Sequence, residues 1–181
     1  LEIRLLNKAA KDGKCVNIIG KEIQLTHFIT VDGIDFNLTG KADRVDLEGD
    51  TLRIIDYKTG KVDNKEVAFS EYNEIIDDVG KAKAFQLLMY AYLYLKMHPN
   101  YIGLDIIAGN FSFKNLKSGL LKVSKKINSK QLEVINITQA VLDDFESQLE
   151  IVLKKINNDS FVQTTELKHC EWCDYKMICK R

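Results

Sequence analysis

The stretch of sequence that decides the fold is residues 40–60, GKADRVDLEGDTLRIIDYKTG. Its centre, Gly49-Asp50, is one of the residue pairs that favour a two-residue hairpin turn between antiparallel strands. The register follows from a turn at this position, and the predicted opposite pairs are Leu47 with Leu52, Asp46 with Arg53, Val45 with Ile54 and Asp43 with Asp56. Like faces like in most of these pairs and opposite charges meet in one, which supports the register.

Asp43 and Asp56 are the pair that points to chemistry. Their Cβ atoms would lie about 5 Å apart, and two like charges so placed are destabilising unless something neutralises them. A divalent cation held by both carboxylates and by water molecules would do so, and such oxygen ligands suit magnesium. Lys58 lies on the same face as Asp56 because strand side chains alternate, and its ammonium group suits a role near an attacking water or a phosphate. Metal, water and cation together favour phosphodiester hydrolysis, although from the spacing alone a surface ion-pair ladder fits equally well.

The flanking sequence predicts a mixed α and β domain. Short β-type runs separated by turn residues predict an antiparallel meander, with strands at 16–19, 23–31, 36–47 and 52–57. We expect a loop with a weak helix at 59–79, a buried helix at 80–97 that ends near His98 before Pro99, strands at 104–113 and 116–123, and an amphipathic helix at 138–157. A further short helix is expected at 1–11.

The composition sets the class of protein. With 181 residues, 45% of them hydrophobic and 29% charged, the chain suits one globular domain and excludes disordered and collagen-like classes. No apolar run approaches the roughly 20 residues of a membrane helix, so no membrane partner is expected. No secretory signal is recognisable, so we expect a cytoplasmic location. The start at Leu1 suggests a fragment of a longer polypeptide.

The formal net charge of zero argues against a histone-like binder of nucleic acid, but it hides a segregation of charge. Residues 106–132 contain no acid and six lysines, which are Lys114, Lys117, Lys122, Lys125, Lys126 and Lys130. Residues 63–78 contain six acids and one lysine. The lysine-rich stretch is therefore a candidate surface for tracking phosphates, with solvated loops as the alternative interpretation.

Together these motifs carry a resemblance. GKADRVD and RIIDYKTG resemble motifs two and three of the PD-(D/E)XK nuclease superfamily in its RecB-like and AddB-like branch, to which CRISPR adaptation nucleases are related. Gln86 and Tyr90, in FQLLMYAYLY, resemble the Q-x-x-x-Y motif of that branch. Glu22, in GKEIQL, matches the acidic residue that opens the strand before motif two. The resemblance covers roughly residues 20–181 with its motifs in the right order.

The resemblance implies a fold and a set of roles. The fold would be an α/β (α+β) restriction-endonuclease-like core with a mixed central sheet flanked by helices, forming a single nuclease domain over 1–181. Asp43, Asp56 and the Tyr57 carbonyl would bind Mg²⁺ or Mn²⁺. Lys58 would orient or activate the water, and Gln86, Tyr90 and Glu22 would complete the site. The early helical motif of the family is not found before Glu22, which fits a fragment.

The implied function is metal-dependent hydrolysis of DNA, as an exonuclease in recombinational repair, within the C-terminal part of a larger helicase-nuclease. DNA and a helicase subunit or domain would be the partners. One alternative is a non-catalytic scaffold of the same fold that binds DNA or a helicase. Another is a zinc-stapled interaction module in which the tail cysteines carry the function.

The cysteine-rich tail at 167–181 also resembles a family feature. Cys170, Cys173 and Cys179 resemble the C-terminal cysteines that hold a [4Fe-4S] cluster in AddB-type domains and in CRISPR adaptation nucleases. A cluster usually needs four cysteines, so it would be incomplete in this fragment. Three cysteines with His169 could instead form a zinc site. Cys15, the remaining cysteine, is better interpreted as a small buried hydrophobic residue than as the fourth ligand.

Overall fold

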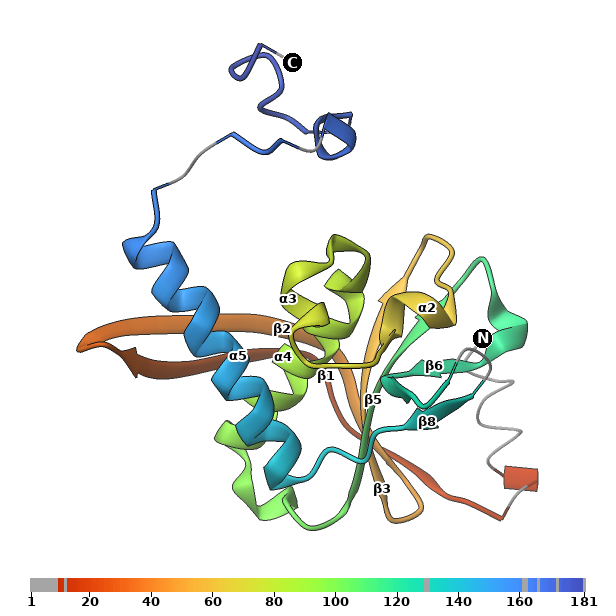
Figure 1. The fold of residues 1–181 in the computed structure, drawn as a ribbon. Coiled ribbons are helices and arrows are strands. Elements are labelled where there is room, and N and C mark those ends of the chain that lie inside the picture. Colours follow the sequence, from red (N-terminus) through yellow and green to blue (C-terminus); the bar gives the residue numbers. More distant parts are fainter. Residues whose placement is uncertain are drawn as a thin grey trace.

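The computed structural model describes residues 10–11, 13–128, 131–160, 163–165, 167–171 and 173–180 (Figure 1). The strands are β1 Val16–Val31, β2 Ile34–Glu48, β3 Thr51–Lys58, β4 Ala68–Phe69, β5 Asp105–Ser112, β6 Leu120–Lys122, β7 Ser124–Lys126 and β8 Leu132–Val134. After β1, the α-helices are α2 Asn64–Val67, α3 Glu74–Asp77, α4 Ala82–Met97 and α5 Gln139–Asn158. Short 3₁₀ turns occupy Val79–Lys81, Pro99–Tyr101, Leu116–Ser118 and Leu167–Cys170.

The described strands form a five-stranded sheet in the order β1-β2-β3-β5-β6 and a three-stranded sheet in the order β4-β7-β8. In the larger sheet the β1-β2 and β2-β3 pairs are antiparallel, whereas β3 and β5 are parallel. The long connection between the two parallel strands carries α4, as a parallel crossover requires. The predicted meander and the mixed central sheet are therefore confirmed.

The β2-β3 hairpin has the predicted turn. Gly49 has a φ of 61°, a left-handed conformation that glycine adopts without steric cost. From there the register runs from Glu48 opposite Thr51 to Arg44 opposite Ile55, as the sequence predicts. The regular pairing of the two strands ends at that point, one step before Asp43 and Asp56.

The face of this hairpin that carries Asp46 holds a buried ion-pair network. Asp46 has no exposed surface and accepts two bonds from Arg53, at 2.7 Å from Nε and 3.0 Å from Nη2. Arg44 also pairs with Asp46, and Glu48 lies 2.7 Å from Arg53. The predicted pairing of Asp46 with Arg53 is confirmed, but inside the protein rather than at its surface.

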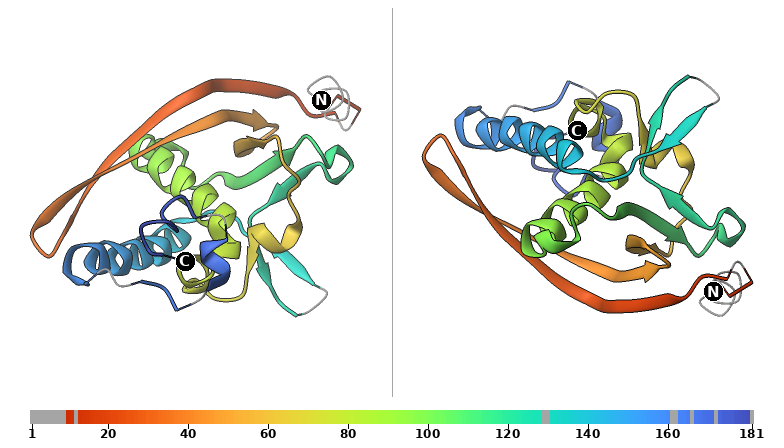
Figure 2. Two further views of the ribbon diagram at one scale, coloured as in Figure 1. Left: turned by 90° about the horizontal axis from the view of Figure 1, so that it is seen from above. Right: turned by 90° about the horizontal axis from the view of Figure 1, so that it is seen from below.

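The β1-β2 hairpin is longer than the sequence indicated. The two expected runs at 16–19 and 23–31 form one strand, because a β-bulge between Ile18 and Gly20 absorbs the irregularity at Gly20. The hairpin extends well beyond the rest of the sheet (Figure 2).

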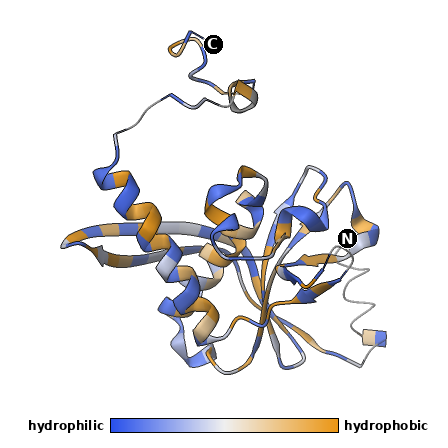
Figure 3. Ribbon diagram, viewed as in Figure 1, coloured by the Kyte–Doolittle hydropathy of each residue, from blue (hydrophilic) through white to orange (hydrophobic). Residues whose placement is uncertain are grey.

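Helices α4 and α5 lie together beside the central sheet (Figures 1 and 2). Helix α4 is buried along much of its length, including Leu87, Leu88 and Ala91. On α5 the buried residues recur at helical spacing, from Leu142 through Leu149 to Leu153, and polar and apolar positions alternate along its ribbon in Figure 3. Thr138 caps the start of α5 by accepting a bond from the Val141 N–H.

The connecting segments differ most from the sequence prediction. Residues 59–79 contain α2, β4 and α3, and residues 116–123 contain a 3₁₀ turn before β6 rather than one strand. Strands β7 and β8 were not predicted, since three-residue strands are too short to show a period. Of the expected helix at 1–11, residues 1–9 lie outside the described residues. No described helix is long and apolar enough to cross a bilayer.

Candidate active site

A carboxylate and an ammonium group form the centre of the candidate site at the end of β3. Asp56 and Lys58 occupy alternate positions of the strand, so both side chains point to the same face of the sheet. Nζ of Lys58 lies 2.9 Å from Oδ2 of Asp56. Asp56 is 4% exposed, whereas the Lys58 side chain is 25% exposed. The ion pair is therefore buried on the Asp56 side and open towards solvent on the Lys58 side.

Helix α4 extends this arrangement with the two residues of the Q-x-x-x-Y pattern. Oε1 of Gln86 accepts a 2.6 Å hydrogen bond from Nζ of Lys58, and Nε2 of Gln86 donates a 2.8 Å bond to the Tyr90 hydroxyl. Gln86 and Tyr90 can meet because they are one helical turn apart. A Cβ atom on Gly40 of β2 would lie 3.1 Å from Cε1 of Tyr90. The absence of a side chain at Gly40 therefore lets α4 approach the sheet closely.

Asp43 lies on β2 where the two hairpin strands separate. Its Oδ2 accepts a 2.7 Å hydrogen bond from the N–H of Tyr57, so a side chain replaces the backbone partner that continued pairing would have supplied. The N–H and C=O of one extended residue point to the same side of a strand. The Tyr57 carbonyl therefore faces the same gap between β2 and β3 as its N–H.

Burial and the neighbouring charge of Asp43 both disfavour the ionised form of Asp56. Burial is the largest cause that raises the pKa of Asp56 above its usual value, and the charge of Asp43 raises it further, although bonds from Lys58 and Asn110 act in the opposite direction. Burial also raises the pKa of Tyr90, with both carboxylates contributing. With two carboxylates and the single ammonium group of Lys58, these three residues carry a formal net negative charge.

This donor set fits a magnesium-type ion. Asp43 and Asp56 each use Oδ2 in the bonds given above, which leaves both Oδ1 atoms without a hydrogen bond from the described residues. Two carboxylate oxygens and the Tyr57 carbonyl are hard ligands, and magnesium commonly takes one or two carboxylates and keeps several waters. Across the described residues, no group of three His, Cys, Asp or Glu side chains forms a fuller protein cage.

Glu22 lies near this site in the sheet, but its carboxylate is paired with Lys41. Its neighbours Lys21 and Ile23 pair with Arg44 and Ala42, which places Glu22 across β1 and β2 from Asp43. Its φ is 52°, and its carboxylate lies 2.7 Å from Nζ of Lys41 with 74% of the side chain exposed. The structure therefore brings together Asp43, Asp56, Lys58, Gln86 and Tyr90, whereas a catalytic role of Glu22 stays a prediction.

Asn110 is a site residue that the sequence analysis missed. It lies on β5 in register with Asp56, has no exposed surface, and donates a 2.7 Å bond from Nδ2 to Oδ2 of Asp56. Its sequence signal was a single amide within the apolar run IIAGNFSF. That signal had no meaning until the pairing of β5 with β3 was known, because 54 positions separate the two residues.

Among the described residues, the tail cysteines are not gathered into a group that could hold a metal ion. Cys170, Cys173 and Cys179 are free thiols of intermediate exposure, and they are not part of any group of three potential ligands among the described residues. The side chain of His169 lies outside the description. Cys15 is exposed, so its interpretation as a buried residue was wrong, because it precedes β1 and lies outside the core.

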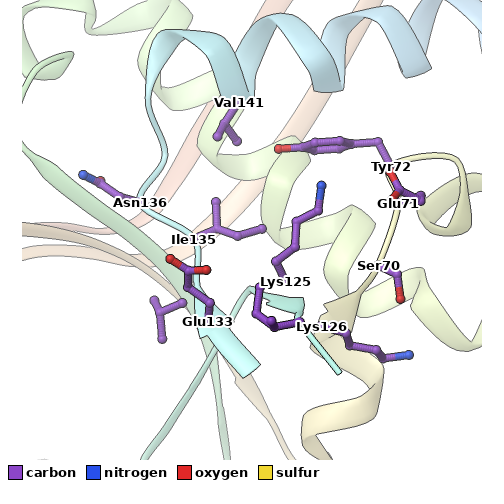
Figure 4. Close-up of a pocket in the computed structure, with 11 residues that line it drawn as sticks. Ser70, Glu71, Tyr72, Lys125, Lys126, Glu133, Ile135, Asn136 and Val141 are labelled. Carbon is purple, nitrogen blue, oxygen red and sulfur yellow. The ribbon is translucent and has the colours of Figure 1, made fainter. Parts of the chain in front are cut away.

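A cavity of about 520 Å³ lies away from Asp43 and Asp56, between residues 70–72, the start of α5 and the smaller sheet (Figure 4). Tyr72, Lys125 and Glu133 are among its lining residues. Nζ of Lys125 lies 5.0 Å from the centre of the Tyr72 ring, and burial raises the pKa of Tyr72 to about 12. None of the predicted site residues lines this cavity.

One of three comparisons with known proteins identifies a family for this chain. A family model described as the PD-(D/E)XK nuclease superfamily matches residues 2–180. A search of curated proteins finds no match. Among solved structures, the crystal structure of SSO0001 matches with 13% sequence identity and a TM-score of 0.46, covering 98% of this chain and 64% of that one. The match of the family model over almost the whole chain, on a mixed sheet flanked by helices, shows that this chain belongs to the PD-(D/E)XK nuclease superfamily.

Proposed function

We propose that this protein is a metal-dependent DNA nuclease that hydrolyses phosphodiester bonds at Asp43, Asp56 and Lys58. The observation that carries the proposal is the Lys58 ammonium group, held 2.9 Å from Asp56 and 2.6 Å from Gln86 and still partly open to solvent. The structural ion pair of Asp46 and Arg53 differs in this respect, because its side chains are only 0% and 7% exposed. A lysine that must meet a phosphate or a water molecule gains from being held in this way.

Each residue then has a defined task. A divalent ion, when bound by Asp43, Asp56 and the Tyr57 carbonyl, supplies charge neutralisation and lowers the pKa of a bound water. Lys58 places a positive charge beside that position. Gln86 fixes the direction of the Lys58 side chain, and the Tyr90 hydroxyl in turn fixes the Gln86 amide. Holding reacting groups in one geometry is a large part of what an enzyme contributes to rate.

The proposed substrate is DNA, and the charge distribution supports it. Lys114 and Lys117 are exposed on the segment that directly follows β5, the strand that carries Asn110. Lys122, Lys125 and Lys126 are partly exposed, and Lys130 lies outside the described residues. No acid occurs in the same stretch, so a nucleic-acid backbone would meet little repulsion along it.

The wider setting is also a proposal. The chain spans 64% of the length of the solved structure that it resembles. The activity of a longer protein is therefore a proposal that rests on the sequence motifs. We propose a cytoplasmic exonuclease of RecB-like or AddB-like type in recombinational repair, forming the C-terminal part of a helicase-nuclease. An iron-sulfur cluster on Cys170, Cys173 and Cys179 stays a prediction that iron analysis of the purified protein can test.

The proposed function is tested with end-labelled linear duplex and single-stranded DNA. The wild-type protein should degrade at least one of them with Mg²⁺ or Mn²⁺ and not with EDTA. Asp56→Ala and Lys58→Ala should abolish the activity, because the first removes a metal ligand and the second removes the cation. Release of mononucleotides from one end would identify exonuclease action.

Matched controls use exposed residues of the same types. Asp50→Asn, at the hairpin tip, and Lys61→Gln, in the loop after β3, should retain wild-type activity. Replacing the three tail cysteines with serine should also leave cleavage intact. If Asp56→Ala cut DNA as fast as the wild type, the proposed function would be wrong.

A further inference from the structure

Asn110 occupies a position where a polar side chain is costly. It is fully buried on β5, on the strand face that also carries the buried Ala108. Burying an amide in such surroundings is unfavourable unless its polar atoms find partners. Only one of the two polar groups of this amide has a partner. Nδ2 is bonded to Asp56, whereas Oδ1 is buried with no partner among the described residues.

The geometry of the bond to Asp56 shows what the amide achieves. Oδ2 of Asp56 receives Nδ2 of Asn110 at 2.7 Å and Nζ of Lys58 at 2.9 Å. The last torsion of an aspartate is soft and broad, so one donor would leave the carboxylate free to turn. Two donors on one oxygen fix its plane and leave Oδ1 as the oxygen that is available for another ligand.

The two donors differ in a way that matters for the site. Lys58 is shared between Asp56 and Gln86, and a substrate that attracts its ammonium group would weaken its hold on Asp56. Asn110 is neutral, fully buried and attached to the neighbouring strand in register. It can hold Asp56 in place while Lys58 moves to meet a substrate.

We propose that Asn110 is the positioning residue of this site, which holds Oδ2 of Asp56 so that Oδ1 is presented to a divalent metal ion while Lys58 remains available to the substrate. This inference rests on the proposed function. The unpartnered Oδ1 of Asn110 supports it, because an apolar residue of the same volume would fit the core without leaving a buried acceptor unsatisfied. Residues that violate the rules of core packing are expected at functional sites.

The test compares Asn110→Leu, which keeps the volume, with Asn110→Ser, which is smaller and remains polar. Binding of Mn²⁺ to the full chain is followed by electron paramagnetic resonance without DNA. Both variants should bind Mn²⁺ about 10-fold more weakly or worse, the usual effect of removing a residue that orients a metal ligand. In cleavage assays at saturating Mn²⁺ we expect kcat to fall about 10-fold to 100-fold with an unchanged KM for DNA.

Ser112→Ala is the matched control. Ser112 lies on the same strand and face, is buried, and donates one hydrogen bond, which goes to the Gly60 carbonyl rather than to Asp56. It should lower the Tm and leave Mn²⁺ binding unchanged, which separates loss of stability from loss of positioning. If Asn110→Leu does not fold, as judged by circular dichroism, Asn110→Ser carries the comparison.

The outcomes separate this inference from the proposed function. A wild-type protein that binds Mn²⁺ and cuts DNA, with folded Asn110 variants that bind Mn²⁺ equally well, would overturn the positioning role alone. A wild-type protein that neither binds Mn²⁺ nor cuts DNA would overturn the proposed function and this inference with it.

Discussion

The backbone N–H of Tyr57 donates a 2.7 Å hydrogen bond to Oδ2 of Asp43 where the pairing of β2 and β3 ends. The aspartate thereby takes the place of a strand partner and keeps the two strands apart. One residue thus ends the pairing, holds the backbone of the strand that carries Asp56 and Lys58, and keeps its second oxygen for another ligand. The opening of the hairpin and the formation of the candidate site are the same local event.

Replacing Asp43 should separate these roles. In Asp43→Asn the amide oxygen can still accept the bond from Tyr57, so we expect a Tm close to that of the wild type. The negative charge is lost, and metal-dependent cleavage should fall about 100-fold or more because one of two charged ligands is gone. Thermal unfolding and cleavage of labelled DNA measure the two effects. A large loss of Tm in Asp43→Asn would show that the charge itself holds the strands.

The contacts of Gln86 predict a non-additive pair of variants. Gln86→Leu removes the acceptor for Lys58 and should lower kcat about 10-fold. Tyr90→Phe removes only the hydroxyl that fixes the Gln86 amide, so it should have a smaller effect. The double variant should be no slower than Gln86→Leu, because members of one hydrogen-bond chain act together. Full additivity of the two losses would mean that Tyr90 acts independently, for example on the DNA.

The structure shows which of these relations could be predicted from the sequence. The turn at Gly49 and the pairing of Asp46 with Arg53 depend on residues close together in the chain, and both were predicted correctly. The spacing of Gln86 and Tyr90 is likewise a property of one helix. Asn110 could not be predicted, because its role arises from a parallel pairing that joins residues 54 positions apart.

Glu22 illustrates a second limit of the sequence. Its position across from Asp43 agrees with the motif, but a register shift at Gly20 and a left-handed backbone at Glu22 itself interrupt the alternation of side chains in β1. Its carboxylate therefore lies beside Lys41. A motif can locate a residue on a strand, whereas only the backbone geometry decides where the side chain points.

The raised pKa of Asp56 predicts how its charge affects stability with pH. Because burial disfavours the ionised form, the ionised carboxylate lowers stability above the ordinary pKa of 3.8, and this penalty vanishes below that value, where both states are protonated. In EDTA at pH 7, Asp56→Asn should therefore have a higher Tm than the wild type, and the difference should shrink as the pH falls below the raised pKa and disappear below 3.8. Added Mg²⁺ should stabilise only the wild type. A lower Tm for Asp56→Asn at pH 7 in EDTA would show that the bond to Lys58 outweighs the cost of burial.

The exposed lysines after β5 predict the salt dependence of DNA binding. The double variant Lys114→Gln/Lys117→Gln should weaken binding and reduce the slope of log K against log salt by about 2 for duplex DNA, since each phosphate contact contributes about 0.9. Fluorescence anisotropy with EDTA and a labelled duplex measures binding without cleavage. Lys154→Gln is a suitable control, because Lys154 is similarly exposed but lies on α5 near Asp32. An unchanged slope in the double variant would exclude this segment from the binding surface.

The contact between Gly40 and Tyr90 predicts an effect of adding one methyl group. A Cβ atom at position 40 would lie 3.1 Å from Cε1 of Tyr90 and 3.3 Å from Cδ1 of Leu93, tighter than ordinary van der Waals contact. Gly40→Ala should push α4 away from β2, and Gln86, which shares that helix, should then lose its short bond to Lys58. We expect a loss of stability of about 1–3 kcal/mol, as is typical of overpacking, together with a fall in kcat.

Adding Tyr90→Leu to Gly40→Ala, which removes the ring that the new methyl group would meet, should restore much of the stability. If Gly40→Ala lowered the Tm without changing kcat, the position of α4 would not control the geometry of Lys58.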